Sequence, residues 1–457
     1  MDIGTISLIL LIGIFVLLAI GMPLGFASGF LALAVLMMKF GPDLLFRSFG
    51  TGPLNILAQR MYGLMTDYVL ISVPLFIFMA CLLERSNIAR DMFDSLNVWL
   101  SRTRGGIAIV TAIMAIIMAA MSGIIGGEIV LLGLIALPNM LRLGYNQNLA
   151  IGTICASGSL GTMIPPSIVL IIYGLVTETS IYALFQAAFV PGFILGGCYI
   201  IYIIIRTRLH PEQAPLPPGG ESVTFADKLR ALPGLVPPLL IVFVVLGSIY
   251  GGITGITEAA GMGVVAVLLL ITLRGELSWR LFLDALMRTY KSTGTILWIT
   301  FGATALAGAY SIAGGPTYVA NLIVGADLPT FGILLVMMLI FLFLGAIMDW
   351  VGIVLLVMPV FLPIVLKLPV EELGLTGGLA AAPGFVAVWF GILFCVNMQV
   401  SFLSPPFGPA AFYLKSVAPP HITLPDIFRG FLPFIAIQLL VLAMVLLFPE
   451  ITMVFAK

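Results

Sequence analysis

Gly161-Thr-Met-Ile-Pro165-Pro166-Ser-Ile-Val-Leu-Ile-Ile-Tyr173 and Ser401-Phe-Leu-Ser-Pro405-Pro406-Phe-Gly-Pro-Ala-Ala-Phe-Tyr413 are the two stretches that decide the fold of this chain. Each lies inside an apolar run of membrane-helix length, and each double proline forces the backbone out of helical geometry. Non-helical backbone at membrane depth is tolerated only where it is buried in protein or lines a polar cavity. Paired breaks at matching places in two halves of a chain point to the binding site of a secondary transporter.

The composition is that of a membrane protein. Hydrophobic residues make up 61% of the 457 residues and charged residues 9%, with a mean hydropathy of +1.21. Apolar runs fall near 5–21, 23–39, 69–84, 106–121, 124–141, 148–177 and 181–205, and again near 235–250, 257–273, 294–312, 330–345, 350–366, 384–414 and 430–449. The net charge is zero, so we expect no nucleic-acid partner, whereas contact with membrane lipids follows from the apolar surface.

The two sets of runs correspond in order, on either side of a hydrophilic, proline-rich connector at 206–232. Cys155 matches Cys395, Tyr173 matches Tyr413, and Pro191 matches Pro433. The amphipathic stretches 43–66 and 277–292 also occupy equivalent places, and we predict that both are helices lying at the membrane surface. The chain therefore reads as two copies of one design.

A topology can be drawn if the runs 106–141 and 330–366 are re-entrant hairpins. Each half then crosses the membrane five times, and an odd number inverts the second half relative to the first. With both termini outside, five basic residues lie outside (Lys39, Arg47, Arg60, Lys367 and Lys457), and the other fifteen lie inside. This asymmetry is the positive-inside pattern. It supports the orientation better than it supports re-entry.

Each predicted hairpin carries an acidic residue near its glycine-containing turn, Glu128 in the first and Asp349 in the second. An ionisable group inside apolar sequence is costly and is by default a functional candidate. The alternative is a structural carboxylate that accepts hydrogen bonds from helix N-termini. Both roles stay open at this point.

The helix breaks are rich in neutral oxygen. Carbonyls freed by Pro165 and Pro405 suit a small hard cation such as Na⁺. Hydroxyl and amide groups add further oxygens nearby, from Ser157, Ser159, Thr162, Asn397, Gln399, Ser401 and Ser404. A single hydroxyl of this kind is most simply explained as bonded back to its own helix. Symmetric clusters around two double prolines favour a binding function.

The chain resembles a known family over essentially its whole length. The sequences LGLIALPNMLRLGY at 132–145, GTMIPPSIVLIIYG at 161–174, GITEAAGMG at 255–263 and SFLSPPFGPAAFYLKSVAP at 401–419 resemble the large permease subunit of TRAP (tripartite ATP-independent periplasmic) transporters. The resemblance implies an all-α polytopic membrane protein of the ion-transporter superfamily, an inverted-repeat elevator with two re-entrant hairpins and two broken helices. It also implies a multi-pass protein of the bacterial or archaeal cytoplasmic membrane.

The resemblance further implies Na⁺-coupled uptake of a small organic acid, with no cofactor beyond the coupling ion and no enzymatic activity. The expected partners are a small four-helix membrane subunit and a periplasmic substrate-binding protein. We divide the chain accordingly into 1–105 (scaffold of the first repeat with a surface arm helix), 106–180 (hairpin plus broken helix), 181–205 (closing helix), 206–232 (cytoplasmic linker), 233–313 (scaffold of the second repeat with an arm helix), 314–416 (hairpin plus broken helix) and 417–457 (closing helix).

Carried over residue by residue, the family's site falls on the two hairpin turns and the two breaks. The expected Na⁺ ligands are Ser122, Ser157, Gly158, Ser159, Gly161, Pro165, Gly345, Asp349, Asn397, Gln399 and Pro405. The expected substrate contacts are Ser122, Gly123, Glu128, Thr162, Asp349, Ser401 and Ser404. The first turn departs from the Ser-Gly-Ser-Ala pattern of many members, since it reads Ser-Gly-Ile-Ile-Gly-Gly-Glu at 122–128.

This variant resembles the branch linked to 2-oxo and 2-hydroxy monocarboxylates. No Lys or Arg lies in the turns or breaks, so a substrate carboxylate would be met by helix N-termini and bound Na⁺. The competing interpretation is a carrier of the same superfamily that works without a binding protein. A channel would lack saturable, Na⁺-dependent uptake, and a hydrolase would need a nucleophile and base that no span supplies.

Overall fold

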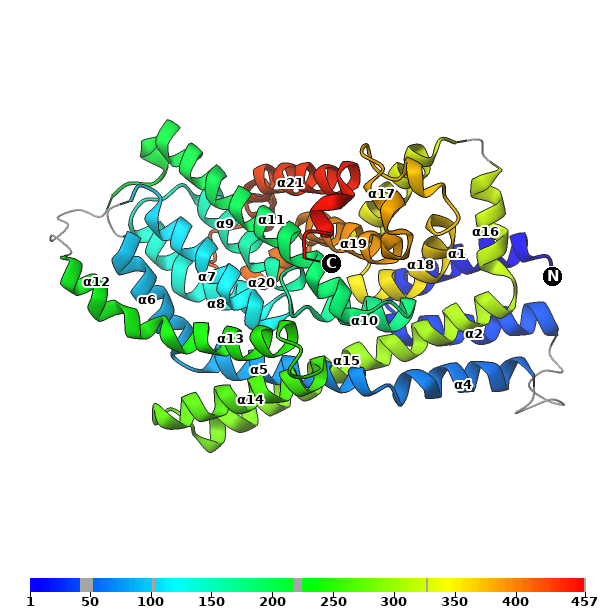
Figure 1. Ribbon diagram of the computed structural model, residues 1–457, viewed down its shortest axis with the longest axis horizontal. Helices are drawn as coiled ribbons and strands as arrows, with labels where there is room; N and C mark the ends of the chain where they lie inside the picture. The colour runs from blue at the N-terminus through cyan, green and yellow to red at the C-terminus, as the bar shows by residue number, and fades with distance from the viewer. Residues whose placement is uncertain (42–51, 101–102, 217–223, 326–327, 456–457) are drawn as a thin grey trace.

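The computed structural model describes residues 1–41, 52–100, 103–216, 224–325 and 328–455, and within these ranges the regular structure is entirely helical (Figure 1). Part of the connector (217–223), the start of the first amphipathic stretch (43–51) and the basic residues Arg47, Arg102 and Lys457 lie outside the described ranges. The all-helical membrane fold expected from the sequence is confirmed.

In the described residues, the first half up to α11 contains ten α-helices and two 3₁₀ turns. They are α1 (Ile3–Ala19), α2 (Leu24–Phe40), α4 (Pro53–Met65), the 3₁₀ turn η1 (Tyr68–Ile71), α5 (Ser72–Arg85), α6 (Ile88–Leu100), α7 (Gly106–Ser122), α8 (Gly127–Arg142), α9 (Gln147–Gly158) with the turn η2 (Leu160–Thr162), α10 (Ile168–Thr177) and α11 (Ile181–Leu209). The pair α7 and α8 is called hairpin 1, and α9, η2 and α10 are called broken helix 1.

The second half repeats this order after α12 (Phe225–Ala231). It consists of α13 (Val236–Tyr250), α14 (Ile256–Leu273), α15 (Trp279–Ile312), α16 (Gly315–Val324), α17 (Thr330–Gly345), α18 (Trp350–Val365), α19 (Val386–Leu403), α20 (Pro409–Lys415) and α21 (Leu424–Leu447). The pair α17 and α18 is called hairpin 2, and α19 and α20 are called broken helix 2. The predicted apolar runs coincide with these helices to within a few residues, except that α15 and α21 begin earlier, at Trp279 and Leu424.

Both double prolines interrupt a helix as expected, and Pro165-Pro166 and Pro405-Pro406 are both cis peptide bonds. The matched prolines Pro191 and Pro433 lie inside α11 and α21. The hairpin helices have 16 or 17 residues. Helices α1 and α2, which the topology counts as spans, have 17 residues each, so helix length alone does not set the hairpins apart.

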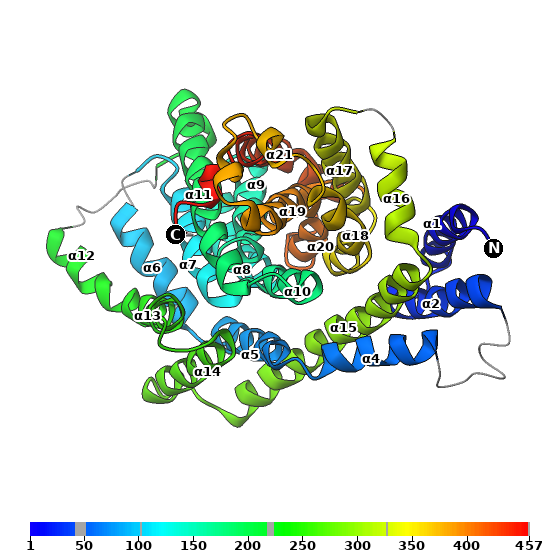
Figure 2. The ribbon, with the colours of Figure 1, turned by 45° about the vertical axis from the view of Figure 1, so that its right-hand side comes forward.

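The scaffold, defined as α1, α2, α4, α5, α13, α14 and α15, shows the internal symmetry directly. Helix α2 packs along α15, and the equivalent helix α14 packs along α5. Helices α4 and α5 run one after the other beside α15 (Figure 2). The same pairing therefore occurs twice with the halves exchanged.

The largest difference from a predicted boundary lies in α15. The stretch 277–292 was expected to be a separate surface helix, but α15 runs without interruption over 34 residues from Trp279 to Ile312. The first half is broken at the equivalent place, because Asp67 accepts a hydrogen bond from the amide of Val69 and starts a new turn. Near the predicted boundary α15 contains Gly294, which weakens the helix, but a single glycine does not end one.

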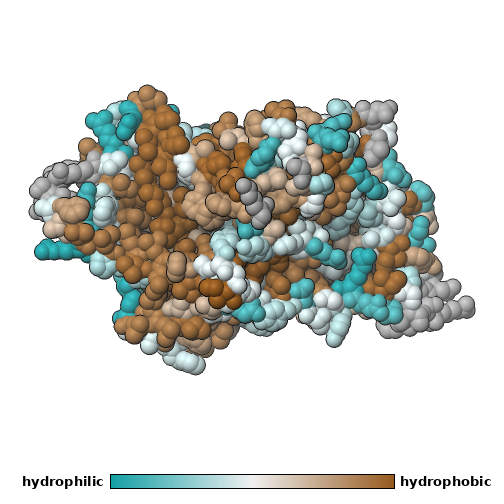
Figure 3. Space-filling view, in the orientation of Figure 1, coloured by the Kyte–Doolittle hydropathy of each residue, from teal (hydrophilic) through white to brown (hydrophobic). Residues whose placement is uncertain are grey.

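The broken helices lie at the centre of the molecule. Every residue of α19 except Ala387 is buried, and so is every residue of α9 from Leu149 to Gly158. The outer helices instead expose large apolar side chains, such as Ile201 and Ile205 of α11 and Phe243 of α13. Figure 3 shows the resulting apolar surface over α11 and α13 in the left half of the view. This surface suits contact with lipid tails.

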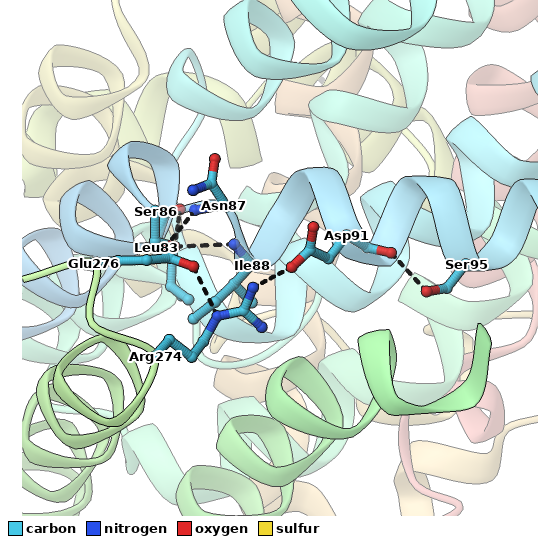
Figure 4. A network of polar contacts seen from close by, with 8 residues as sticks. All are labelled: Leu83, Ser86, Asn87, Ile88, Asp91, Ser95, Arg274 and Glu276. Carbon is cyan, nitrogen blue, oxygen red and sulfur yellow. Dashed lines mark hydrogen bonds and ion pairs between the residues drawn. The ribbon is translucent and has the colours of Figure 1, made fainter. Parts of the chain in front are cut away.

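A polar network fastens the connector between the scaffold and hairpin 1 (Figure 4). Arg274, just after α14, donates to Asp91 of α6 and to Glu276 at 2.8 Å, and Glu276 accepts the amide of Asn87 at 2.9 Å. Burial by itself raises the pKa of Glu276, but the Asn87 amide and the Arg274 guanidinium outweigh it and lower the pKa below its ordinary value. The start of α6 is therefore anchored to the end of α14.

Candidate functional site

The tip of hairpin 1 meets the break of broken helix 1. The amide of Ile168, just after Pro165-Pro166, donates a hydrogen bond to the carbonyl of Gly123 at 3.1 Å. Gly123 has a φ of +67°, and a Cβ at this position would lie 2.4 Å from the carbonyl oxygen of Pro166. Only glycine allows both the backbone conformation and the close approach.

Hairpin 2 meets broken helix 2 in the equivalent way. The amide of Phe407, just after Pro405-Pro406, donates to the carbonyl of Ala346 at 3.3 Å. A Cβ on Gly345 would lie 2.0 Å from the hydroxyl oxygen of Ser401, so the absence of a side chain lets the two segments touch. Each hairpin tip therefore lies against the double-proline break of its own half. The four predicted site segments thus come together in two pairs.

Glu128 lies on the inner side of hairpin 1. Its carboxylate is fully buried, and its Oε1 accepts the hydroxyl of Ser122. A Cβ on Gly161 of η2 would lie 2.9 Å from Oε1, so the carboxylate packs directly on broken helix 1. Ser122, Glu128 and Gly161 thus form one cluster.

A second cluster joins the two broken helices. Ser159 donates to the side-chain oxygen of Gln399 at 2.8 Å, and the amide nitrogen of Gln399 donates to the hydroxyl of Thr162 at 2.6 Å. All three side chains are buried. Because the cluster couples α9 and η2 to α19, it fixes the breaks of the two repeats against each other.

Three buried oxygens at the breaks have no partner among the described residues. They are the hydroxyl oxygen of Ser157, the side-chain oxygen of Asn397 and Oε2 of Glu128. Asn397 is held in place because its amide nitrogen donates to the carbonyl of Met338 on α17 at 2.9 Å. Buried polar atoms are nearly always hydrogen-bonded, so unpaired oxygens in such positions are candidates for binding a cation or water.

The other predicted site residues have simpler surroundings. Ser401 and Ser404 each donate to the carbonyl four residues earlier in α19, at 3.2 and 2.8 Å. Asp349 is the N-cap residue of α18, and Gly158 lets α9 pack closely on Ile129 of α8. For the two serines the local explanation is sufficient, because a back-bonded hydroxyl is common inside a helix.

Sequence reasoning missed two neighbours of the hairpin 1 tip. Tyr413 of α20 lies against Gly126, where a Cβ would come within 2.9 Å of its ring, and Glu84 of α5 lies against Gly127. The sequence marks Tyr413 only as the counterpart of Tyr173 in the repeat. Glu84 carried no signal, since it precedes Arg85 at the end of an apolar run and reads as an ordinary helix end.

Comparison with known proteins agrees with this architecture. Residues 11–451 match the model of the family described as "Tripartite ATP-independent periplasmic transporter, DctM component". This chain belongs to that family. It is thus the large permease subunit of a TRAP transporter, as the sequence motifs predicted, and a multi-pass membrane protein.

Similar DctM-family proteins carry different substrate names. The permease is 29% identical to the C4-dicarboxylate TRAP transporter large permease protein of Pseudomonas aeruginosa, over 92% of this chain and 91% of the relative. It is 28% identical to the sialic acid TRAP transporter large permease protein of Vibrio cholerae, over 96% and 95%. It is 27% identical to the ectoine TRAP transporter large permease protein of Halomonas elongata, over 96% of each chain.

Among solved structures, the permease is similar to the YdaH transporter of Alcanivorax borkumensis, described as having an unusual topology. The TM-score is 0.55 at 14% sequence identity, over 93% of this chain and 96% of that one. At this identity the likeness concerns the fold alone.

Proposed function

We propose that this permease takes up a small organic acid by Na⁺-coupled secondary transport, with the ion and the substrate bound where the hairpin tips meet the helix breaks. The observation that carries the proposal is the set of buried, unpaired oxygens of Ser157, Glu128 and Asn397 at these junctions. Oxygen donors are the ligands that a hard cation prefers.

The arrangement offers one cation position in each half. In the first half the Glu128 carboxylate packs against Gly161 of broken helix 1, and Ser157 lies in the last turn of α9 with its hydroxyl unpaired. In the second half Asn397 is held by Met338 with its oxygen unpaired. A bound Na⁺ would supply the missing partner for these oxygens and would offset the buried charge of Glu128.

The substrate anion has no fixed cation in the turns or breaks, since none of these segments contains Lys or Arg. The N-termini of helices that begin at the tips and breaks supply a partial positive charge instead, together with Na⁺. Relatives named for a dicarboxylate, sialic acid and ectoine support a small charged solute. A 2-oxo or 2-hydroxy monocarboxylate is the substrate class that we propose.

The contacts with the scaffold support an elevator movement. The hairpin 1 tip lies against Glu84 near the end of α5, and Gly352 beside the hairpin 2 tip lies against Leu24 at the start of α2. In the predicted orientation both scaffold positions are cytoplasmic. Cavities of about 280 and 610 Å³ lie between the scaffold and the second hairpin, the larger lined by Arg60 and Glu178 on the predicted outer side. The two hairpins and the two broken helices are called the transport elements. We infer that they lie toward the cytoplasmic side of the scaffold in this structure.

The proposed partners are a small four-helix membrane subunit and a periplasmic binding protein that delivers the substrate, in keeping with the tripartite family description. The termini are proposed to be periplasmic. The test is uptake of radiolabelled 2-oxo and 2-hydroxy acids into proteoliposomes that contain the permease and its small subunit. Uptake that needs both a Na⁺ gradient and the binding protein supports the proposal.

Uptake at the same rate in a K⁺ gradient would contradict Na⁺ coupling. Uptake without the binding protein would favour the binding-protein-independent carrier instead. Ser157→Ala and Asn397→Ala are expected to weaken the Na⁺ dependence, whereas the matched variant Ser404→Ala loses only a hydrogen bond within its own helix. Equal Na⁺ activation in all three variants would show that the unpaired oxygens do not bind the ion.

A further inference from the structure

Glu84 on the scaffold reaches across to hairpin 1. It lies in the last turn of α5, and its side chain is only 9% exposed. Its Oε2 lies 3.7 Å from the guanidinium of Arg288 on α15, while its Oε1 is buried and has no hydrogen-bond partner among the described residues. A carboxylate held by one long ion pair within the scaffold has a free oxygen directed at the neighbouring hairpin.

Oε1 of Glu84 lies where a side chain at position 127 would be. Gly127 is the first residue of α8, and a Cβ built on it would lie 1.5 Å from Oε1 of Glu84 and 2.3 Å from its carboxyl carbon. A Cβ there would force the carboxylate end of the Glu84 side chain to move away from this position. The backbone of Gly127 does not have a positive φ, so alanine is compatible with the backbone itself.

The charge also suits this position. Helix α8 begins after Gly126, which has no side chain to cap it, so the amides of the first turn carry the positive end of the helix dipole without a side-chain partner from the N-cap. A carboxylate beside the first residue is attracted to this end. Glu128 follows directly but turns inward to Ser122, so the carboxyl group on the scaffold side is that of Glu84.

We propose that Glu84 is a positioning residue that docks hairpin 1 on the scaffold in this arrangement and separates from Gly127 when the transport elements move. The inference rests on the proposed elevator movement. While Glu84 occupies the end of α8, a substrate carboxylate cannot bind there from the scaffold side. The contact therefore links the position of the hairpin to the availability of one of the proposed anion-binding ends.

The first test is a rescue experiment in the complete transporter, with uptake measured in proteoliposomes. Gly127→Ala is expected to lower the uptake rate by at least about tenfold, because overpacking disfavours the docked arrangement. Glu84→Ala makes room, so the double variant is expected to return to within about threefold of Glu84→Ala alone, which is a non-additive result typical of residues in contact. Gly261→Ala in α14, where a Cβ meets nothing within 4 Å, is the matched control.

The second test separates this inference from the proposed movement. Cysteines are introduced at 84 and 127 in a chain whose four native cysteines are replaced by alanine, and uptake is measured before and after reduction. A disulfide that arrests uptake until it is reduced supports docking and release. If the disulfide arrests uptake but the Glu84→Ala/Gly127→Ala double variant shows no rescue, the role of Glu84 is overturned while the proposed elevator movement is still supported. Full uptake with the disulfide formed would overturn the movement itself.

Discussion

Gly123→Ala tests whether the contact between hairpin 1 and broken helix 1 is needed for transport. Alanine at a φ of +67° costs about 1–2 kcal/mol. Its Cβ would also lie 2.4 Å from the carbonyl oxygen of Pro166, which belongs to backbone and cannot rotate away. Overpacking of this kind adds about 1–3 kcal/mol. We therefore expect a total of about 2–5 kcal/mol.

Gly21→Ala is the matched control, because Gly21 has a φ of +87° but a Cβ there would meet nothing within 4 Å. It should lose only the backbone part, about 1–2 kcal/mol. The assay is thermal unfolding of the purified permease, followed by uptake at equal protein density. Gly123→Ala should unfold at a lower temperature than Gly21→Ala and should lose uptake beyond its loss of folded protein. Equal behaviour of the two variants would refute the proposed tip contact.

Three further results are expected. Gln399→Leu should lower stability by on the order of one kcal/mol for each of its two lost hydrogen bonds, because the hydroxyls of Ser159 and Thr162 keep their bonds to backbone carbonyls, whereas Gln186→Leu at a more exposed position should change the melting temperature little. Arg274→Ala should increase proteolysis near α6, because it releases Asp91 and Glu276, and unchanged protection would contradict the anchoring role. The pKa of Glu276 is lowered in the folded protein, so the stability that its carboxylate contributes is present at neutral pH. This contribution is lost as pH falls below about 4.3 toward the lowered pKa of the folded state. Glu276→Gln should therefore lower the melting temperature at pH 7 more than at the lowest pH at which the protein stays folded.

Much of the architecture could be predicted because the bilayer restricts what a chain can do. Apolar length fixed the helices, and the double prolines fixed the breaks, since no helix continues through Pro165-Pro166 or Pro405-Pro406. The structure adds that each hairpin tip meets the break in its own half. The prediction that failed was local: the stretch 277–292 contains nothing that stops a helix, so it continues through Gly294 into the span.

The site could be predicted only at the level of segments. Ser157 and Ser401 are equivalent by residue type, yet the hydroxyl of Ser157 is unpaired whereas that of Ser401 bonds to the carbonyl of Asn397. That difference depends on packing between helices far apart in sequence. Glu84 could not be found at all, because its role arises from a glycine on another element, Gly127, that leaves space for it.

The central claim is that unpaired oxygens at the hairpin tips and helix breaks bind Na⁺. Thermal unfolding of the purified permease in rising Na⁺, with K⁺ replacing it at constant ionic strength, tests this most directly. A bound ion at about one hundred times its dissociation constant should stabilise the fold by about 2.7 kcal/mol. The account predicts stabilisation by Na⁺ but not K⁺, reduced in Ser157→Ala and Asn397→Ala. Equal stabilisation by both ions, or a Na⁺ effect unchanged in both variants, would contradict it.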